Sequence, residues 1–332
     1  MNSCSQNHPV RTSLGFLPTP VHALDRLSRV LNGPRILIKR DDLTGLASGG
    51  NKVRKLEFLL GDALKNGCDT VITGGAAQSN HCRQTAAAAA YCGLQCHLVL
   101  GGQPPECLDG NLLLDDLFGA EIHWTGPYRK GEKIPEIVER LAAMGRRPYV
   151  IPYGGSNAVG ALGFVRAMQE LEEQLLAMQE NINAIVFASS SGGTQAGMIV
   201  GRSRLGRTYK LIGIGIDKGE AGDAPFDEHI LQLARETAGL LDTEINISIR
   251  DITINNDFFG KGYGVIGELE RNAIRLMAET EGVLLDPVYT GRALGGLTAM
   301  IKQGEFNVDD TVLFWHTGGM PALFSYAEEL QR

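Results

Sequence analysis

The sequence predicts an α/β fold of two domains, each an open, mostly parallel twisted sheet covered by helices. Short runs of branched apolar residues alternate with helical patterns along most of the chain, and such alternation gives parallel sheets with helices on both faces. The chain has 332 residues, of which 43% are hydrophobic and 21% are charged. That length exceeds what one hydrophobic core usually organises, so a globular protein with two domains is expected.

The expected elements follow one another in a regular order. Short segments rich in branched residues predict strands at 35–39, 70–73, 97–100, 121–124, 149–151, 184–188, 211–216, 247–254 and 311–315. Apolar residues spaced by three and four predict helices around 24–30 and at 53–66, 84–91, 134–144, 162–178 and 268–281, with another beginning near Gln195. No repeat, low-complexity tract or proline-rich linker is present, so composition does not locate the domain boundary.

The composition favours a small-molecule partner. A net charge of -7 offers no basic surface for nucleic acid or for an anionic membrane. No apolar run approaches the length of a membrane span, and residues 1–20 hold neither a signal-peptide core nor an arginine-rich stretch. We therefore expect a cytoplasmic protein that binds neither membranes nor nucleic acids.

No metal site is predicted. The cysteines are too sparse for a disulfide scaffold and are interpreted mostly as buried thiols. They are Cys4, Cys68, Cys82, Cys92, Cys96 and Cys107. Cys92 and Cys96 lie close to His97 in the sequence, but no second pair follows at the spacing of a zinc site.

Lys52 is the first candidate for chemistry, because it lies at the start of the helix expected at 53–66. The positive end of the helix dipole and the charges of Arg54 and Lys55 favour the neutral amine and lower its pKa. A neutral lysine amine is what covalent attachment of a carbonyl cofactor requires. The alternative is an ordinary solvated lysine.

The loop at 74–81 joins a predicted strand to a predicted helix. Backbone amides at a helix start attract anions, and Ser79 and Asn80 add side-chain donors that would suit a carboxylate. On local grounds, simple helix capping by these two residues is the stronger interpretation. The similar loop at 154–157 is also interpreted as a helix cap.

The loop at 189–194 has the composition of a phosphate-binding site. Its glycines let backbone N–H groups approach an anion, its hydroxyls add hydrogen bonds, and a helix follows. The Gly-Lys-Ser/Thr ending of a nucleotide P-loop is missing, so a monophosphate ester fits better than a triphosphate. A tight turn without a ligand is the alternative.

The segment at 262–267 matches the glycine pattern of dinucleotide-binding sites and precedes a predicted helix. The residues before it, 255–261, read as a loop and not as a strand that runs into the turn, which argues against a Rossmann site. A nicotinamide-dependent oxidoreductase remains the alternative from another enzyme class.

Several motifs together resemble one enzyme family. They are Arg40-Asp41-Asp42 followed by Gly49-Gly50-Asn51-Lys52, then Gln78-Ser79-Asn80-His81, the loop at 189–194, Glu281 to Gly291, and Phe314 to Gly319. The chain resembles, over nearly its whole length, the D-cysteine desulfhydrase and 1-aminocyclopropane-1-carboxylate deaminase family. These are enzymes of the tryptophan-synthase-β-like fold that use pyridoxal phosphate.

The resemblance implies roles for the cofactor site. Lys52 would bind pyridoxal 5'-phosphate covalently, and Asn80 would reach its phenolic oxygen. Tyr289 would lie near the ring, and Thr317 would face the pyridine nitrogen. The cofactor phosphate would be bound by Ser191, Gly192, Gly193 and Thr194.

The resemblance also implies how a small amino-acid substrate is bound. Ser79 and the amides of Asn80 and His81 would bind its carboxylate, and Tyr263 would lie in its pocket. Lys52, Ser79, Tyr263 and Tyr289 are the expected catalytic residues. The family organisation implies a large domain at 1–54 and 159–332, a small inserted domain at 55–158, and a homodimer.

Two departures from the family bear on the substrate. The cyclopropane deaminases have a glutamate and a leucine where this chain has Thr290 and Thr317, and Thr290 is counted among the expected substrate-binding residues. A carboxylate that keeps the ring nitrogen protonated makes the ring a stronger electron sink, and a threonine hydroxyl supplies no such charge. We therefore expect elimination from D-cysteine, with L-cysteate sulfo-lyase or cyclopropane deaminase activity, or a non-catalytic cofactor carrier, as alternatives.

Overall fold

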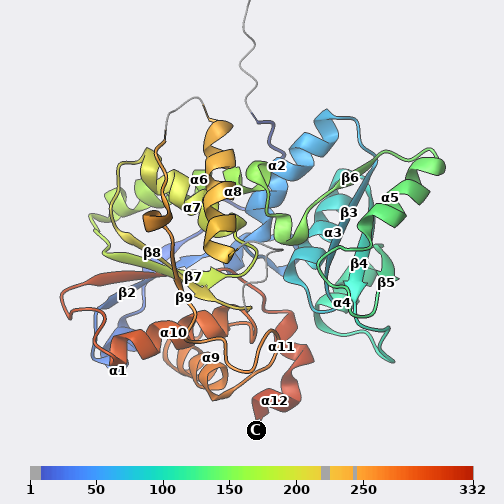
Figure 1. Ribbon diagram of the computed structural model, residues 1–332. Helices are drawn as coiled ribbons and strands as arrows, with labels where there is room; N and C mark the ends of the chain where they lie inside the picture. Colours follow the sequence, from blue (N-terminus) through green and yellow to red (C-terminus); the bar gives the residue numbers. More distant parts are fainter. Residues whose placement is uncertain (1–8, 218–224, 242–244, 332) are drawn as a thin grey trace, which may run out of the picture.

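Two sheets make up the computed structural model, which describes residues 9–217, 225–241 and 245–331. Figure 1 shows them beside one another, the larger one built from both ends of the chain and the smaller one from a continuous middle stretch. The α/β class and the mostly parallel sheets that the sequence predicts are confirmed. Cys4 lies outside the described residues, and the five described cysteines are free.

The larger sheet has six strands in the order β1-β2-β10-β7-β8-β9. Only β1 runs antiparallel to its neighbour; every other pair is parallel. The strands are β1 (Val21–Ala23), β2 (Arg35–Arg40), β7 (Ala184–Ser189), β8 (Lys210–Gly215), β9 (Thr253–Asn255) and β10 (Thr311–His316).

Helices cover both faces of the larger sheet (Figure 1). One face packs against α6 (Ala158–Met178), α7 (Gly193–Arg204) and α8 (Phe226–Gly239). The other packs against α1 (Asp25–Leu31), α9 (Glu268–Glu281) and α10 (Thr290–Lys302). Successive β2 residues face opposite cores, since Leu37 joins the first and Ile36 and Ile38 join the second. This explains why the central strands read as continuous apolar runs.

The smaller sheet has four parallel strands in the order β5-β4-β3-β6. These strands are β3 (Thr70–Ala76), β4 (Gln95–Gly101), β5 (Glu121–Trp124) and β6 (Pro148–Val150). One face packs on α2 (Lys52–Lys65) and α3 (Asn80–Cys92), and the other on α5 (Ile134–Ala143). The remaining elements are α4 (Gly110–Leu117), α11 (Ala322–Ser325), α12 (Ala327–Gln331) and four 3₁₀ turns, Asp41–Leu43, Leu46–Ser48, Tyr153–Gly155 and Ile249–Asp251.

Most predicted elements are present within a few residues of their expected ends. The strand predicted at 247–254 is wrong except for its last residues, because a 3₁₀ turn occupies 249–251. In that turn the backbone N–H of Ser248 donates to Asp251 Oδ2 over 3.0 Å, a capping interaction that interrupts an extended chain. The sequence prediction also missed β1, α4, α8, α10, α11 and α12.

None of the helices in the described part of the chain combines the length and the apolar character needed to cross a bilayer.

Candidate active site

A cavity lies where α2, α3 and α7 begin, at the carboxyl ends of β3 and β7. Helix starts from both sheets therefore point their unpaired backbone N–H groups toward one space. The residues that line it are Asn51, Lys52, Ser79, Asn80, His81, Tyr153, Gly154, Ala188, Ser189, Ser190, Ser191, Gly192, Thr194, Gln195, Tyr289 and Thr317.

Lys52 is the first residue of α2 and lines this cavity, as its position in the sequence predicts. Its Nζ donates to the carbonyl oxygen of Gly154 over 3.2 Å. Removal of the amine from bulk water lowers its pKa to about 8. The expected effect of the two neighbouring charges was wrong, because Arg54 binds Asp41 and Glu170 instead, and the hydrogen bond with Lys55 raises the pKa of Lys52.

Lys55 is a second amine in the same place, one helical turn after Lys52. Its Nζ lies 3.1 Å from the carbonyl oxygen of Gly154 and 3.1 Å from Ser156 Oγ. Burial, and secondly the charge of Lys52, hold the pKa of Lys55 well below its usual range. Lys52 on the cavity wall and Lys55 beside it thus both lose their protons far more readily than ordinary lysines.

Ser79 caps α3, and the residues after it form the first turn of that helix. Ser79 Oγ accepts the backbone N–H of Cys82 over 3.2 Å, and its O–H also interacts with the Cys82 side chain, a weak acceptor that a carboxylate would replace. Asn80 Oδ1 accepts from Asn111 Nδ2 over 2.9 Å, and His81 Nε2 lies 2.9 Å from the hydroxyl of Thr73. The loop at 74–81 therefore caps α3 and also forms part of the cavity wall.

The loop at 189–194 forms a cup at the start of α7. Gly192 has φ +83°, a backbone conformation that residues with a side chain rarely adopt. The backbone N–H groups of this loop lie just before the first turn of α7. Thr194 Oγ1 accepts from Asn51 Nδ2 over 3.3 Å. Ser191 and Thr194 line the cavity, whereas the backbone N–H of Gly193 donates to Ser156 Oγ over 3.1 Å and is turned away from it.

The two expected tyrosines meet. Their hydroxyls are 2.7 Å apart and their rings pack edge to face. Tyr289 lines the cavity, and Tyr263 lies behind it. Burial raises the pKa of both phenols well above their ordinary value, so each retains its proton at neutral pH.

The two threonines that depart from the family pattern are placed differently. Thr317 lines the cavity. Thr290 is buried away from it, and its hydroxyl donates to Asp286 Oδ1 over 2.7 Å. Asp286 also accepts the backbone N–H of Thr290 over 2.7 Å, so this pair fixes the start of α10. The structure thus separates Thr290 from Ser79, Asn80 and His81, which line the cavity.

The loop at 154–157 does more than the sequence prediction assigned to it. Asn157 caps α6 as expected, since its Oδ1 accepts the N–H of Gly160 over 2.8 Å. Ser156, however, lies 2.8 Å from Ser191 Oγ, and Gly154 is the shared acceptor of both lysines. The signal in the sequence was a Gly-Gly-Ser-Asn motif similar to the loop at 74–81, but no local feature links it to Lys52.

The glycine pattern at 262–267 does not form a dinucleotide site. β9 ends at Asn255, and an irregular loop separates it from α9, so no strand runs directly into the glycine turn. His316, at the end of β10, is buried, and its Nε2 lies 2.9 Å from the carbonyl oxygen of Leu284.

The cavity fits an aldehyde that carries a phosphate group. Lys52 supplies a readily deprotonated amine, and the loop at 189–194 supplies hydroxyls and helix-start amides for an anion. Gly154 keeps the space between them open, because a Cβ there would lie 3.3 Å from Lys52 Nζ and collide with Ser191. Its φ of +66° excludes most side chains independently of that contact.

Known proteins are similar to this chain in sequence and, in one case, in structure. D-cysteine desulfhydrase from Klebsiella pneumoniae (strain 342) is 46% identical over 329 residues, covering 96% of this chain and 97% of the relative. D-cysteine desulfhydrase from Salmonella choleraesuis (strain SC-B67) is 45% identical over 322 residues, with 95% and 96% covered. A crystal structure of an ACC deaminase homologue superposes with a TM-score of 0.87 at 39% identity, covering 98% of this chain and 96% of that one.

The family model "Pyridoxal-phosphate dependent enzyme" matches residues 12–318, and therefore almost the whole chain. Its match includes the start of α2, the cup at the start of α7 and the end of β10. The resemblance noted in the sequence is thereby confirmed: the chain belongs to the family of pyridoxal-phosphate dependent enzymes.

Proposed function

We propose that this protein is a carbon-sulfur lyase that converts D-cysteine to pyruvate, ammonia and hydrogen sulfide. The observation that carries the proposal is Lys52, a cavity-wall amine with a pKa lowered to about 8, adjacent to the helix starts of α3 and α7. The D-cysteine desulfhydrases that share 45–46% of its sequence support the choice of substrate.

Residues of this chain would bind both ends of the cofactor. Lys52 Nζ is the attachment point for the aldehyde, while Ser191, Gly192 and Thr194 face the phosphate, with Gly193 fixing the loop through Ser156. Bound pyridoxal phosphate supplies an electron sink for the charge that develops on the substrate α-carbon. Asn80 and Thr317 line the same cavity and would serve the phenolic oxygen and the ring nitrogen.

The start of α3 is suited to a substrate carboxylate. The Ser79 hydroxyl can donate to a carboxylate in place of the weakly accepting Cys82 side chain, and the first-turn amides of Asn80 and His81 belong to the unpaired N–H groups of a helix start. A carboxylate bound there brings the substrate α-carbon to the cavity that Lys52 lines. Lys52 Nζ would then remove the α-proton as a general base.

Proton delivery to the leaving sulfur would fall to the tyrosine pair. Tyr289 lines the cavity, and its hydroxyl is 2.7 Å from that of Tyr263. Their raised pKa values keep both phenols protonated, so one can donate to a departing thiolate while the other resupplies or stabilises it.

Positions 290 and 317 bear on the choice between D-cysteine and 1-aminocyclopropane-1-carboxylate. Neither threonine supplies the negative charge that the glutamate of the deaminases provides, whereas opening a cyclopropane requires strong carbanion stabilisation. Thr290, at the position where the deaminases have glutamate, donates a hydrogen bond to Asp286 and does not line the cavity. We therefore expect D-cysteine to be the better substrate.

The test is a visible absorption spectrum of the purified protein before and after D-cysteine, followed by parallel assays with D-cysteine, L-cysteate and the cyclopropane acid. A cofactor band that shifts, with sulfide released fastest from D-cysteine, is the expected result. Faster sulfite release from L-cysteate, or equal or faster deamination of the cyclopropane acid, would replace the proposed substrate. A cofactor band that no amino acid changes would indicate a carrier.

We further propose the domain division 1–54 with 159–332, and 55–158, together with a cytoplasmic homodimer. The boundaries fall within α2 and at the start of α6, the two helices through which the chain passes between the sheets. Light scattering should give a mass near twice 35.8 kDa, and a mass of one chain would contradict the dimer.

A further inference from the structure

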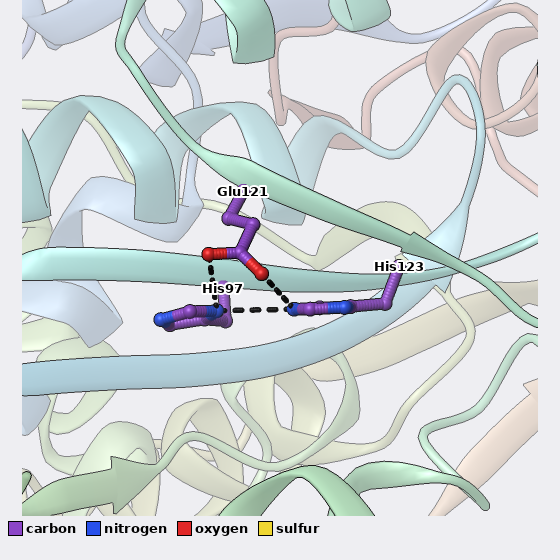
Figure 2. Close-up of side chains that lie close together, drawn as sticks. All are labelled: His97, Glu121 and His123. Carbon is purple, nitrogen blue, oxygen red and sulfur yellow. Dashed lines mark hydrogen bonds and ion pairs between the residues drawn. The ribbon is translucent and has the colours of Figure 1, made fainter. Parts of the chain in front are cut away.

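Three potential metal ligands lie together on the smaller sheet, outside the cavity described above. His97 is on β4, and Glu121 and His123 are on β5, the edge strand beside it. The parallel register pairs His97 with Glu121, and His123 lies two residues further along the same face. Figure 2 shows all three side chains directed toward one another.

Their distances match those of a coordination shell. His97 Nδ1 is 3.0 Å from His123 Nε2, and the two Glu121 oxygens lie 3.6 Å from His97 Nδ1 and 3.4 Å from His123 Nε2. Four ligands at the usual zinc–nitrogen distance of about 2.0–2.1 Å are separated from one another by about 3.3 Å. With one atom taken from each residue, the three ligand atoms all lie within 4.8 Å of one another, so small side-chain movements would bring them to the corners of such a shell.

The two imidazoles are in the state that binds metals. Burial lowers the pKa of His97 and His123, and the nearby Arg140 opposes protonation further, which together outweigh Glu121. Their rings are nearly coplanar, at 14°, and share one hydrogen bond between ring nitrogens. An ion would displace that shared proton, and a modest rotation of each ring would turn both lone pairs toward it.

The cluster is separate from the site of the proposed reaction. None of its three residues lines the cavity, and their face of the sheet packs on α5. Cys96, the neighbour of His97, belongs to the core on the opposite face, so the Cys92-Cys96-His97 arrangement considered from the sequence does not come together.

We propose that His97, Glu121 and His123 bind one zinc ion or a divalent transition-metal ion of similar preference, with water completing the shell. Two imidazoles and a carboxylate are ligands that zinc accepts, and the fourth position faces solvent because Glu121 is exposed. The bound ion cross-links the edge strand β5 to β4. It thereby stabilises the smaller sheet without taking part in the reaction.

The experiment is calorimetric titration of the cofactor-loaded enzyme, stripped of metal by a chelator, with zinc chloride. Cobalt(II) absorption provides a second readout, because tetrahedral nitrogen and oxygen ligation gives a visible band. One ion per chain and a raised melting temperature are expected. His123→Ala and Glu121→Gln should each weaken binding at least about tenfold, and His22→Ala, in the other sheet, should not change it.

A gain-of-affinity variant separates this site from damage to the fold. Arg140 Nη2 lies 3.4 Å from His123 Nδ1, so its charge repels a bound cation. Arg140→Gln should tighten zinc binding about two- to fivefold, whereas Arg166→Gln, an exposed arginine on α6, should have no effect. Unchanged zinc affinity in both His123→Ala and Glu121→Gln, or binding lost instead in Cys107→Ser, would overturn the proposal.

Discussion

The first turn of α2 directs basic side chains to two opposite environments. On one side, the Nζ atoms of Lys52 and Lys55 share the carbonyl oxygen of Gly154. No carboxylate among the described residues neutralises these two amines. On the other side, Arg54 lies 2.8 Å from Asp41 and 2.8 Å from Glu170. Both sides are withdrawn from water, and only the second is neutralised by acids.

The difference teaches that the partner, and not burial alone, decides the charge of a buried base. Without a carboxylate, burial lowers the pKa of Lys52 to about 8 and makes the amine reactive. With Asp41 and Glu170 beside it, Arg54 has a raised pKa, and Arg54 and Lys39 hold the pKa of Glu170 at about 2. One side is suited to chemistry and the other to fixing the helix.

Replacing Lys52 should have the largest effect. Lys52→Ala removes both the attachment point and the proposed base, so turnover of D-cysteine should fall by about 10⁴-fold or more. The visible band of the attached cofactor should be lost at the same time. Lys65→Ala, in the last turn of the same helix, is the matched control and should keep both. A Lys52→Ala enzyme with near-normal rate would exclude the proposed chemistry.

Replacing Arg54 should mainly lower stability. Arg54→Met leaves Asp41 and Glu170 without their shared cation, and removal of one partner from a buried ion pair typically costs about 3–5 kcal/mol. Urea unfolding measures this cost, and the cofactor band of the folded variant should persist. The matched control is Arg35→Met. Arg35 pairs with Glu180 at the surface, so a loss of unfolding free energy below about 1 kcal/mol is expected. Equal losses in the two variants would remove the distinction between these ion pairs.

Replacing Lys55 should cost less than replacing Arg54, although both side chains are buried. Lys55→Met removes hydrogen bonds to Gly154 and Ser156 but leaves no buried charge without a partner. A loss of about 1–2 kcal/mol in the free energy of unfolding is therefore expected in urea. A loss as large as that of Arg54→Met would mean that Lys55 is charged in the folded protein and that the comparison fails.

Sequence reasoning located site residues that lie at helix starts better than it located contacts between segments that are distant in the chain. Lys52, Ser79 and the loop at 189–194 each lie at a helix start that periodicity locates, and all are found at one cavity. The hydrogen-bond partner of Lys52 could not be predicted, because Gly154 lies 102 positions away and no local sequence pattern indicates that the two residues meet.

The fold was predicted on the same terms. Strands buried on both faces, such as β7 and β10, are continuous apolar runs and were found. α10 was missed because its Gly291, Gly295 and Gly296 lower helix propensity, and only packing against α9 and the sheet compensates. The cluster at His97, Glu121 and His123 depends on strand order, which the sequence alone does not give.

The smallest expected effect concerns pH, and it tests the proposed charge of Lys52 directly. Only the neutral amine attaches the cofactor, and with a pKa of about 8 its neutral fraction falls from one half at pH 8 to about one tenth at pH 7. The rate at which added pyridoxal phosphate develops its visible band on the cofactor-free protein should therefore fall about fivefold over that interval, compared with about tenfold for a free-lysine reference. The same depressed pKa means that the unfolded chain binds more protons between pH 8 and 10.5, so Lys52 makes stability rise with pH in that window. An attachment rate that still climbs tenfold per pH unit above pH 9 would show a solvated, ordinary lysine, and the contrast between the two sides of α2 would not hold.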